Sequence, residues 1–235
     1  MQFAYANISW LKDFIRRRIS TTMDISYLGH AAFRLKGKTA SLVVDPYDPS
    51  VGPKFPKVEA DIVAVTHSHS DHNAIANVGG TPFVVSGPGE YEVKGIEVVA
   101  VKSFHDNKQG AERGLNTIYN FKIDKINICH LGDLGQSTLT EAQVEEIGNV
   151  DILLLPVGGH YTIDAAEANK IASQLEPKII IPMHFKEAET KIEELATVDQ
   201  FLKEIGKENL EPVNKLTVTT DKLPEETQVV LMSRA

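Results

Sequence analysis

The sequence predicts an α/β protein in which two β-sheets pack together and are covered by helices. Short apolar segments separated by turn residues dominate the first half of the chain, which is typical of β-strands. In the second half, segments with helical spacing alternate with strongly apolar strands. A chain of 235 residues can bury a substantial core within one domain. Strands followed by alternating strands and helices favour packed sheets with helices outside them.

The predicted strands fall into two groups along the chain. The opening group is bounded by turn residues and predicts antiparallel neighbours around Gly29-His30. Several later strands are almost uniformly apolar, which indicates burial on both faces. The full set covers residues 24–28, 32–35, 40–44, 62–66, 98–101, 117–123, 126–129, 152–155, 178–181, 215–219 and 229–232.

In the second half of the chain, three helices are predicted from capping residues and apolar spacing. Thr140 is an N-cap for the first helix, and Asp164 caps the second, which ends before Pro177. The third has no such cap and is predicted from its spacing alone. The helices cover residues 140–147, 164–175 and 198–204.

The charge and composition of the chain limit the kinds of partner and the cellular compartment that are expected for it. The net charge of −8 disfavours nonspecific binding to nucleic acid, because the surface would repel phosphate groups. No apolar stretch reaches the roughly 18 to 20 residues that a transmembrane helix needs. The single cysteine, Cys129, cannot form an intramolecular disulfide and lies in an apolar run, which fits an inert buried thiol in a reducing compartment. We therefore expect a cytoplasmic protein that does not bind nucleic acid nonspecifically, with homo-oligomer formation left open.

The start of the chain differs in character from the rest. Its apolar residues have loosely helical spacing, and Arg16, Arg17 and Arg18 follow them rather than precede them. This order is the reverse of a secretory signal peptide. We expect an N-terminal extension over residues 1–22, helical or disordered, and a single domain over residues 23–235. A helix on a membrane surface is the alternative interpretation, since basic amphipathic segments bind anionic lipids.

Histidines and aspartates recur where the predicted apolar strands end. In sheets covered by helices, ligands bind at the carboxyl ends of the strands, so side chains distant in sequence can converge there. Metal ligands or catalytic groups are therefore expected at this edge. The residues in such positions are Asp45, His67, His105, His130, Asp133 and His184.

The densest group is the run His67-Ser68-His69-Ser70-Asp71-His72, which follows a predicted buried strand. Divalent metals such as zinc favour imidazole and carboxylate ligands. His67 and His69 lie two residues apart, so in extended backbone they would face the same side and hold one ion. Asp71 and His72 follow in the turn into a predicted helix and could reach a second ion. A solvated polar turn is the alternative, but three histidines and one aspartate in six positions favour metal binding.

With this motif the sequence resembles the metallo-β-lactamase fold superfamily, whose members carry His-x-His-x-Asp-His after a buried strand. The resemblance also covers Leu42-Val43-Val44-Asp45-Pro46, Gly132-Asp133 and Ile181-Pro182-Met183-His184, and it spans residues 24–235. It implies a four-layer αββα sandwich of two mixed β-sheets flanked by helices. Further segments resemble compact metal-dependent hydrolases related to ascorbate-6-phosphate lactonase. These segments cover residues 27–33, 130–135 and 156–159.

The resemblance implies a site for two divalent metal ions, zinc first, with manganese, iron or nickel as alternatives. His67 and His69 would bind the first ion together with a third histidine. His105 and His130 both lie where this third ligand could come from, and we favour His105.

The second ion would be bound by Asp71, His72 and His184 in the same scheme. Asp133 matches the aspartate that bridges the two ions. Asp45 would support the histidine run through hydrogen bonds, since carboxylates behind the ligands orient them.

This implied ligand set predicts a hydrolase of a small ester, lactone or phosphoester. A hydroxide held between two ions is available at neutral pH, because coordination lowers the pKa of water toward ~7. It would attack a carbonyl or phosphoryl centre while Asp71 orients it and later carries a proton. His30, His160 or His130 would protonate the leaving group. Arg113 could present its cation to a phosphate or carboxylate of the substrate.

Three other functions use the same residues differently. A metal-dependent nuclease or phosphodiesterase is the first, although the chain is acidic and leaves little length for a polymer-binding insertion. A non-haem iron redox protein is the second, because iron can occupy the same ligands. A scaffold protein is the third, but it would be expected to have lost ligands that this chain retains. Specificity is expected to lie in the loops over residues 46–56 and 102–116.

Overall fold

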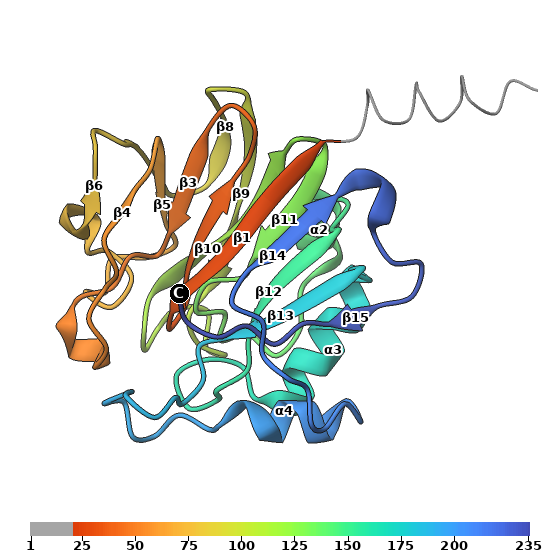
Figure 1. Ribbon diagram of the computed structural model, residues 1–235. Coiled ribbons are helices and arrows are strands. Elements are labelled where there is room, and N and C mark those ends of the chain that lie inside the picture. Colours follow the sequence, from red (N-terminus) through yellow and green to blue (C-terminus); the bar gives the residue numbers. More distant parts are fainter. Residues whose placement is uncertain (1–20) are drawn as a thin grey trace, which may run out of the picture.

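The computed structural model describes residues 21–235, in which two large β-sheets pack against each other (Figure 1). The first sheet contains, in spatial order, β14 (Leu216–Thr219), β1 (Thr22–Gly29), β2 (Ala32–Lys36), β3 (Ser41–Val44), β5 (Ile62–Val65) and β7 (Phe83–Ser86). The second contains β15 (Gln228–Val229), β13 (Ile179–Met183), β12 (Ile152–Pro156), β11 (Ile126–His130), β10 (Leu115–Ile123), β9 (Ile96–Phe104) and β8 (Gly89–Val93). A small separate pair is formed by β4 (Val58–Glu59) and β6 (Val78–Gly79).

Both large sheets are mixed. In the first, the strands from β14 to β3 are antiparallel neighbours, and β3, β5 and β7 are parallel. In the second, β8 to β11 are antiparallel, and β11, β12, β13 and β15 are parallel. Parallel neighbours bring the carboxyl ends of their strands to the same edge, which is where ligand sites form in such sheets.

The main core lies between the two sheets. Along β1, the side chains of Met23, Ile25 and Tyr27 are buried and alternate with more exposed residues, as expected for a strand with one face on a core. Phe33 from the same sheet and Phe121 from the opposite sheet belong to the same hydrophobic cluster. Burial of this apolar surface holds the two sheets together.

The outer layers of the two sheets differ. The helices α2 (Glu141–Ile147), α3 (Ala165–Leu175) and α4 (Val198–Glu204) form a second core with the outer face of the second sheet. The outer face of the first sheet is covered by loops and the short 3₁₀ helices η1 (Pro49–Val51) and η2 (Ile75–Asn77), which form a third core. A further 3₁₀ helix, η3 (Thr220–Lys222), follows β14. The predicted class, two mixed sheets with helical outer layers, is confirmed, with one outer layer built from loops and 3₁₀ turns.

Most predicted elements are present within a few residues of their expected bounds. The helices at Thr140 and Asp164 both begin with capping boxes, in which the cap side chain bonds the backbone three residues on. Strands β4, β6, β7 and β8 were not predicted. The helix expected directly after His72 is wrong, because only the three-residue η2 follows.

The predicted extension over residues 1–22 lies outside the described residues, except at its end, where β1 begins at Thr22. Within residues 21–235, no helix is both long and apolar enough to cross a bilayer. Cys129 is fully buried, as expected, and burial raises the pKa of its thiol.

Candidate metal centre

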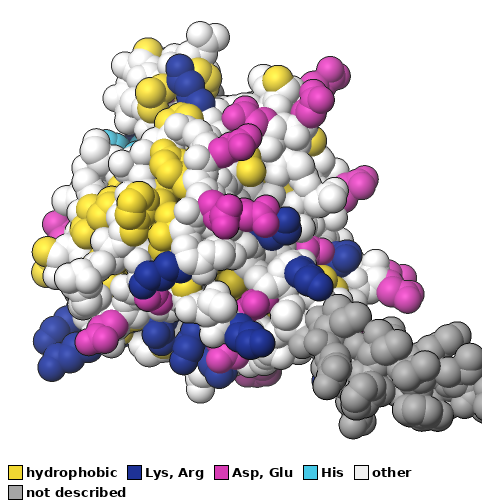
Figure 2. All heavy atoms as spheres, turned by 90° about the horizontal axis from the view of Figure 1, so that it is seen from above, with side chains coloured by type: hydrophobic (Ala, Val, Ile, Leu, Met, Phe, Trp, Pro, Cys, Tyr) yellow, Lys and Arg dark blue, Asp and Glu magenta, His cyan; other side chains and the backbone are white. Residues whose placement is uncertain are grey.

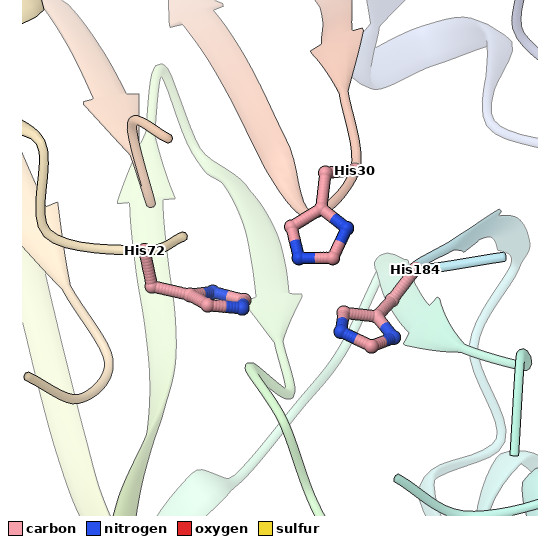
Figure 3. Close-up of side chains that lie close together, drawn as sticks. All are labelled: His30, His72 and His184. Atoms are coloured by element: carbon pink, nitrogen blue, oxygen red, sulfur yellow. The ribbon is translucent and has the colours of Figure 1, made fainter. Parts of the chain in front are cut away.

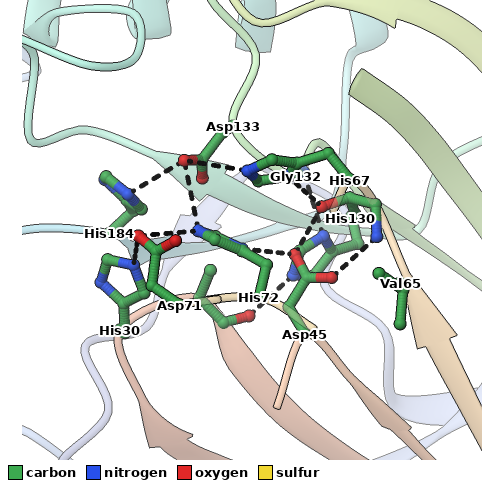
Figure 4. Close-up of polar contacts among 12 residues, drawn as sticks. His30, Asp45, Val65, His67, Asp71, His72, His130, Gly132, Asp133 and His184 are labelled. Atoms are coloured by element: carbon green, nitrogen blue, oxygen red, sulfur yellow. Dashed lines mark hydrogen bonds and ion pairs between the residues drawn. The ribbon is translucent and has the colours of Figure 1, made fainter. Parts of the chain in front are cut away.

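The candidate ligands meet at one edge of the two sheets, each just beyond the carboxyl end of a strand (Figure 4). The run from His67 follows β5, and His30 sits in the tight turn between β1 and β2. From the second sheet, His105 follows β9, Asp133 follows β11 and His184 follows β13. The convergence predicted from the strand ends is therefore present in the structure.

A first cluster consists of His67, His69 and His105. One ring nitrogen of each lies within 4.8 Å of the others, a spacing at which three imidazoles can hold one ion. Their ring centroids are 4.6 to 5.2 Å apart. The backbone at His67 and His69 is bent rather than extended, so a turn and not strand alternation brings the two rings together.

A second cluster consists of His30, His72 and His184, which converge from three separate segments (Figure 3). All three side chains are buried, and one ring nitrogen of each again lies within 4.8 Å of the others. The Asp71 carboxylate adjoins this cluster, with Oδ2 3.4 Å from His30 Nε2 and 3.7 Å from His72 Nε2. The sequence interpretation missed His30 as a ligand candidate. Its sequence signals were its place after a strand and a glycine, which is common in turns, and the resemblance over residues 27–33, which indicated only a residue of the pocket.

Asp133 lies between the two clusters (Figure 4). Its Oδ2 atom is 3.2 Å from Nε2 of His72, and 3.3 Å from Nε2 of both His105 and His184. The distance to His67 Nε2 is 3.9 Å. A single carboxylate oxygen thus faces histidines of both clusters.

Asp45 supports this arrangement from behind. It is fully buried, and its carboxylate accepts hydrogen bonds from the Thr66 backbone N–H at 2.9 Å and from the Thr66 hydroxyl at 2.7 Å. It also lies 2.9 Å from Nδ1 of His72. With Nδ1 donating to this carboxylate, the Nε2 lone pair of His72 is directed toward Asp133.

The two competitors for the third ligand of the first ion differ in their hydrogen bonds. His130 Nε2 lies 2.8 Å from the Ala31 carbonyl oxygen, and His130 Nδ1 accepts the Gly132 N–H at 3.0 Å. Both ring nitrogens of His130 are therefore engaged by the backbone. His105, by contrast, lies within the first cluster, so the geometry favours His105 as the ligand.

The cavity at this edge has a volume of about 520 Å³. It is lined by residues of both loops that were expected to determine substrate specificity. Two further lining residues, Tyr161 and Ile192, were not identified from the sequence. His160 is exposed and does not line this cavity, but it lines a neighbouring one together with His105, Arg113 and Tyr161. The lining residues are Ser50, His69, Ser70, Asp71, His105, Glu112, Arg113, Asp133, Tyr161, His184 and Ile192.

The side chains of the two clusters fit divalent metal ions. Buried polar atoms are normally hydrogen-bonded, yet several buried nitrogen and oxygen atoms at this edge have no such partner. Ion coordination would satisfy one ring nitrogen of each histidine, and histidine with carboxylate is a donor set that suits zinc and related ions. The atoms concerned are Nδ1 and Nε2 of His30, Nε2 of His67, Nε2 of His72, Nδ1 of His105, Oδ1 of Asp133 and Nδ1 of His184.

Comparison with known proteins agrees with this geometry. A family model described as a beta-lactamase superfamily domain matches residues 24–184. This chain belongs to the metallo-β-lactamase superfamily. A metal-dependent hydrolase from Thermococcus kodakarensis is 31% identical over 193 residues, which cover 69% of this chain and 84% of the relative. A metal-dependent hydrolase from Thermoplasma acidophilum is 32% identical over 189 residues, covering 69% and 83%.

A solved structure from Thermotoga maritima, assigned as a zinc-dependent hydrolase of the same superfamily, is 42% identical with a TM-score of 0.74. The match covers 89% of this chain and 98% of that one. The predictions of the superfamily, of its fold and of a metal-dependent hydrolase are confirmed by these matches.

Burial and neighbouring charges shift the pKa values of the groups around Asp133 in opposite directions. Burial lowers the pKa of His67 to about 3 and that of His30 to about 4, so both rings are neutral and available as ligands. Burial alone would raise the pKa of Asp133, but His184 and His72 outweigh it and hold that pKa well below its usual range. Burial likewise lowers the pKa of His72, whereas Asp133 and Asp45 raise it well above the usual value.

The backbone at the site is unusual for non-glycine residues. His30, Asp45 and His184 have φ values of 57°, 49° and 51°, in the left-handed region that costs about 1 to 3 kcal/mol per residue. Close packing adds a second constraint, because a Cβ at Gly158 would lie 2.1 Å from the His184 carbonyl oxygen. Strained residues and forced close contacts are tolerated where surrounding structure overdetermines them, which is common at functional sites.

Proposed function

We propose that this protein uses two divalent metal ions to hydrolyse a small ester, lactone or phosphoester. The observation that carries the proposal is the placement of Asp133, whose Oδ2 atom faces histidines of both clusters at 3.2 to 3.9 Å. A carboxylate in this position can bridge two ions. Zinc is the ion best matched to the histidine-rich set.

In this proposal, His67, His69 and His105 hold the first ion. His72 and His184 hold the second, with Asp133 between them. When bound, such ions polarise a carbonyl or phosphoryl oxygen and make water nucleophilic at neutral pH.

Asp71 is the residue best placed to handle protons. Its side chain is 26% exposed and lines the cavity, whereas the neighbouring His30 is buried behind it. Asp71 therefore orients the attacking water and passes its proton toward the leaving group. His30 Nε2 lies 3.4 Å from the Asp71 carboxylate on its inner side, and His30 contributes a ring nitrogen to the second cluster. His160, outside the cavity, has no part in this proposal.

The size and surface of the site favour a small substrate. A cavity of about 520 Å³ lies within the range of about 300 to 1,000 Å³ typical of small-molecule sites. Among the described residues, Arg113 is the one lysine or arginine that lines the cavity. On the single face that Figure 2 shows, basic and acidic side chains are interspersed. A polymer with a phosphate backbone would need a continuous basic surface at the site.

The test combines metal analysis with a hydrolysis screen. We expect two ions per chain by inductively coupled plasma mass spectrometry, and turnover of at least one substrate in a panel of lactones, thioesters and phosphodiesters. Asp133→Asn should lower both metal content and turnover. Asp61→Asn is the control, because it makes the same change of carboxylate to amide at a residue that belongs to neither cluster. Stoichiometric iron without hydrolysis, one ion held independently of Asp133, or cleavage confined to RNA or DNA would contradict the proposal.

A further inference from the structure

The wall of the cavity contains one permanent positive charge. Among the described residues, Arg113 is the only lysine or arginine that lines it. Of the acidic lining residues, Asp133 lies between the two proposed ions, which would neutralise it, and Asp71 adjoins the second cluster. The remaining acid, Glu112, forms an ion pair with Lys108. The guanidinium of Arg113 has no carboxylate partner among residues 21–235.

The loop that carries Arg113 is tied down next to a proposed ligand. The buried carboxylate of Asp106, adjacent to His105, accepts four backbone N–H bonds from this loop. They come from Lys108 and Gly110 at 2.8 Å, Glu112 at 2.9 Å and Arg113 at 2.8 Å. The Arg113 backbone is thus fixed relative to the metal centre. A fixed cation loses less conformational entropy when it binds a ligand.

The Arg113 side chain is oriented by a second contact. Its guanidinium carbon lies 5.2 Å from the centroid of the Tyr161 ring, within the range of a cation–π interaction. Both residues are half-buried and line the cavity together. Stacking on an aromatic face leaves the N–H groups in the guanidinium plane free to bind a planar carboxylate or a phosphate through two hydrogen bonds.

We propose that Arg113 binds an anionic group of the substrate, a carboxylate or a phosphate, so that this enzyme acts on anionic rather than neutral esters, lactones or phosphoesters. The inference rests on the proposed function, because it assigns the substrate class of the same cavity. Arg113 is a specificity-determining residue in this scheme, and Tyr161 is a positioning residue that holds it.

The test measures affinity, so that it does not depend on turnover. Succinate, glutarate and adipate are titrated by isothermal titration calorimetry into the full-length protein, whose metal content has been measured. Each is compared with the monocarboxylate of equal carbon number, and 2-phosphoglycolate is compared with glycolate. The first carboxylate can occupy the metal centre in every case, and only the second anionic group distinguishes the members of a pair.

We expect at least one doubly anionic ligand to bind about tenfold or more tightly than its partner, since bonds to charged groups are worth about one such factor or more. Arg113→Gln should abolish this preference. Lys102→Gln removes an exposed lysine from the preceding strand that does not line the cavity, and it should leave the preference intact. Which arm shows the preference identifies carboxylate or phosphate. Equal affinities in the wild-type protein, or a preference that survives Arg113→Gln, would overturn the proposal.

Two variants of Tyr161 test whether its aromatic ring positions Arg113. Tyr161→Phe keeps the aromatic face and should keep the preference, whereas Tyr161→Leu should weaken it. A protein that prefers doubly anionic ligands but hydrolyses nothing in the panel would refute the proposed function and leave this inference standing. Turnover of neutral and anionic esters with equal kcat/KM, without any affinity preference, would support the proposed function and refute the role of Arg113.

Discussion

Replacing Asp45 by asparagine is expected to weaken metal binding while leaving the shape of the side chain almost unchanged. Asp45 Oδ1 accepts the Thr66 N–H at 2.9 Å, and Oδ2 faces the Thr66 hydroxyl at 2.7 Å and His72 Nδ1 at 2.9 Å. An asparagine that keeps its oxygen on the Thr66 N–H must present its NH₂ group to His72 Nδ1. His72 Nδ1 can then only accept a hydrogen bond, so the ring proton moves to His72 Nε2, the atom 3.2 Å from Asp133 Oδ2.

The expected loss of metal affinity in Asp45→Asn follows from the number of proposed ligands that Asp45 contacts. Asp45 contacts one proposed ligand directly, and loss of such a supporting group typically costs about 10- to 100-fold in metal affinity. This corresponds to about 1.4 to 2.7 kcal/mol of binding free energy. The second ion should be affected more than the first, because His72 belongs to the second cluster.

The assay is a competition titration of zinc between the protein and a chromogenic chelator, with thermal unfolding of the metal-free protein as a check on folding. Asp61→Asn is again the matched control, since Asp61 accepts bonds from the N–H and hydroxyl of Ser41 in the same sheet but contacts no proposed ligand. Wild-type zinc affinity in a folded Asp45→Asn variant would refute the argument. An equal loss in both variants would show that the effect is not specific to the site.

Three further outcomes are expected. His105→Ala should lose one ion per chain by metal analysis, whereas His130→Gln should keep both ions and lower only the unfolding temperature, because the backbone engages both ring nitrogens of His130; the opposite pattern would exchange their roles. Gly158→Ala should reduce metal content more than Gly148→Ala, since its Cβ would lie 2.1 Å from the His184 carbonyl oxygen and nothing lies within 4 Å of a Cβ at Gly148; equal metal content in the two variants would show that the contact relaxes freely. Removing the metal with a chelator should lower the melting temperature, because an ion that binds the native state stabilises it by mass action; an unchanged melting temperature in calorimetry would mean that the ions are not held tightly.

The strands that could be predicted from the sequence are those that face a core. In β1 the alternation of buried and exposed positions is visible in the residue types, and the apolar β12 is buried along its whole length. The missed strands β7 and β8 lie at sheet edges, where this pattern fails. Phe83 and Val84 in β7 are 53% and 41% exposed, and β8 carries two glutamates. Edge strands are held by a single neighbour, so their residue types carry less information.

The same reasoning explains which parts of the site were predictable. A dense motif such as the run from His67 to His72 can be recognised from the sequence alone, because its residues are adjacent in the chain. The preference for His105 over His130 came from the resemblance, since the bonds that separate the two join His130 to Ala31 and Gly132, and Ala31 is 99 positions away from His130. The sequence alone does not show which carbonyl lies opposite a ring nitrogen.

The division of the ligands between the two sheets gives this centre a structural consequence. His67, His69 and His72 follow a strand of the first sheet, whereas His105 and Asp133 follow strands of the second. Each cluster draws ligands from both sheets, and Asp133 Oδ2 lies 3.2 to 3.9 Å from Nε2 of four of their histidines, His67, His72, His105 and His184. Ions bound there would therefore join the two sheets at the edge where their strands end. The histidine run alone supplies no complete cluster, so packing of the sheets has to precede, or accompany, assembly of the metal centre.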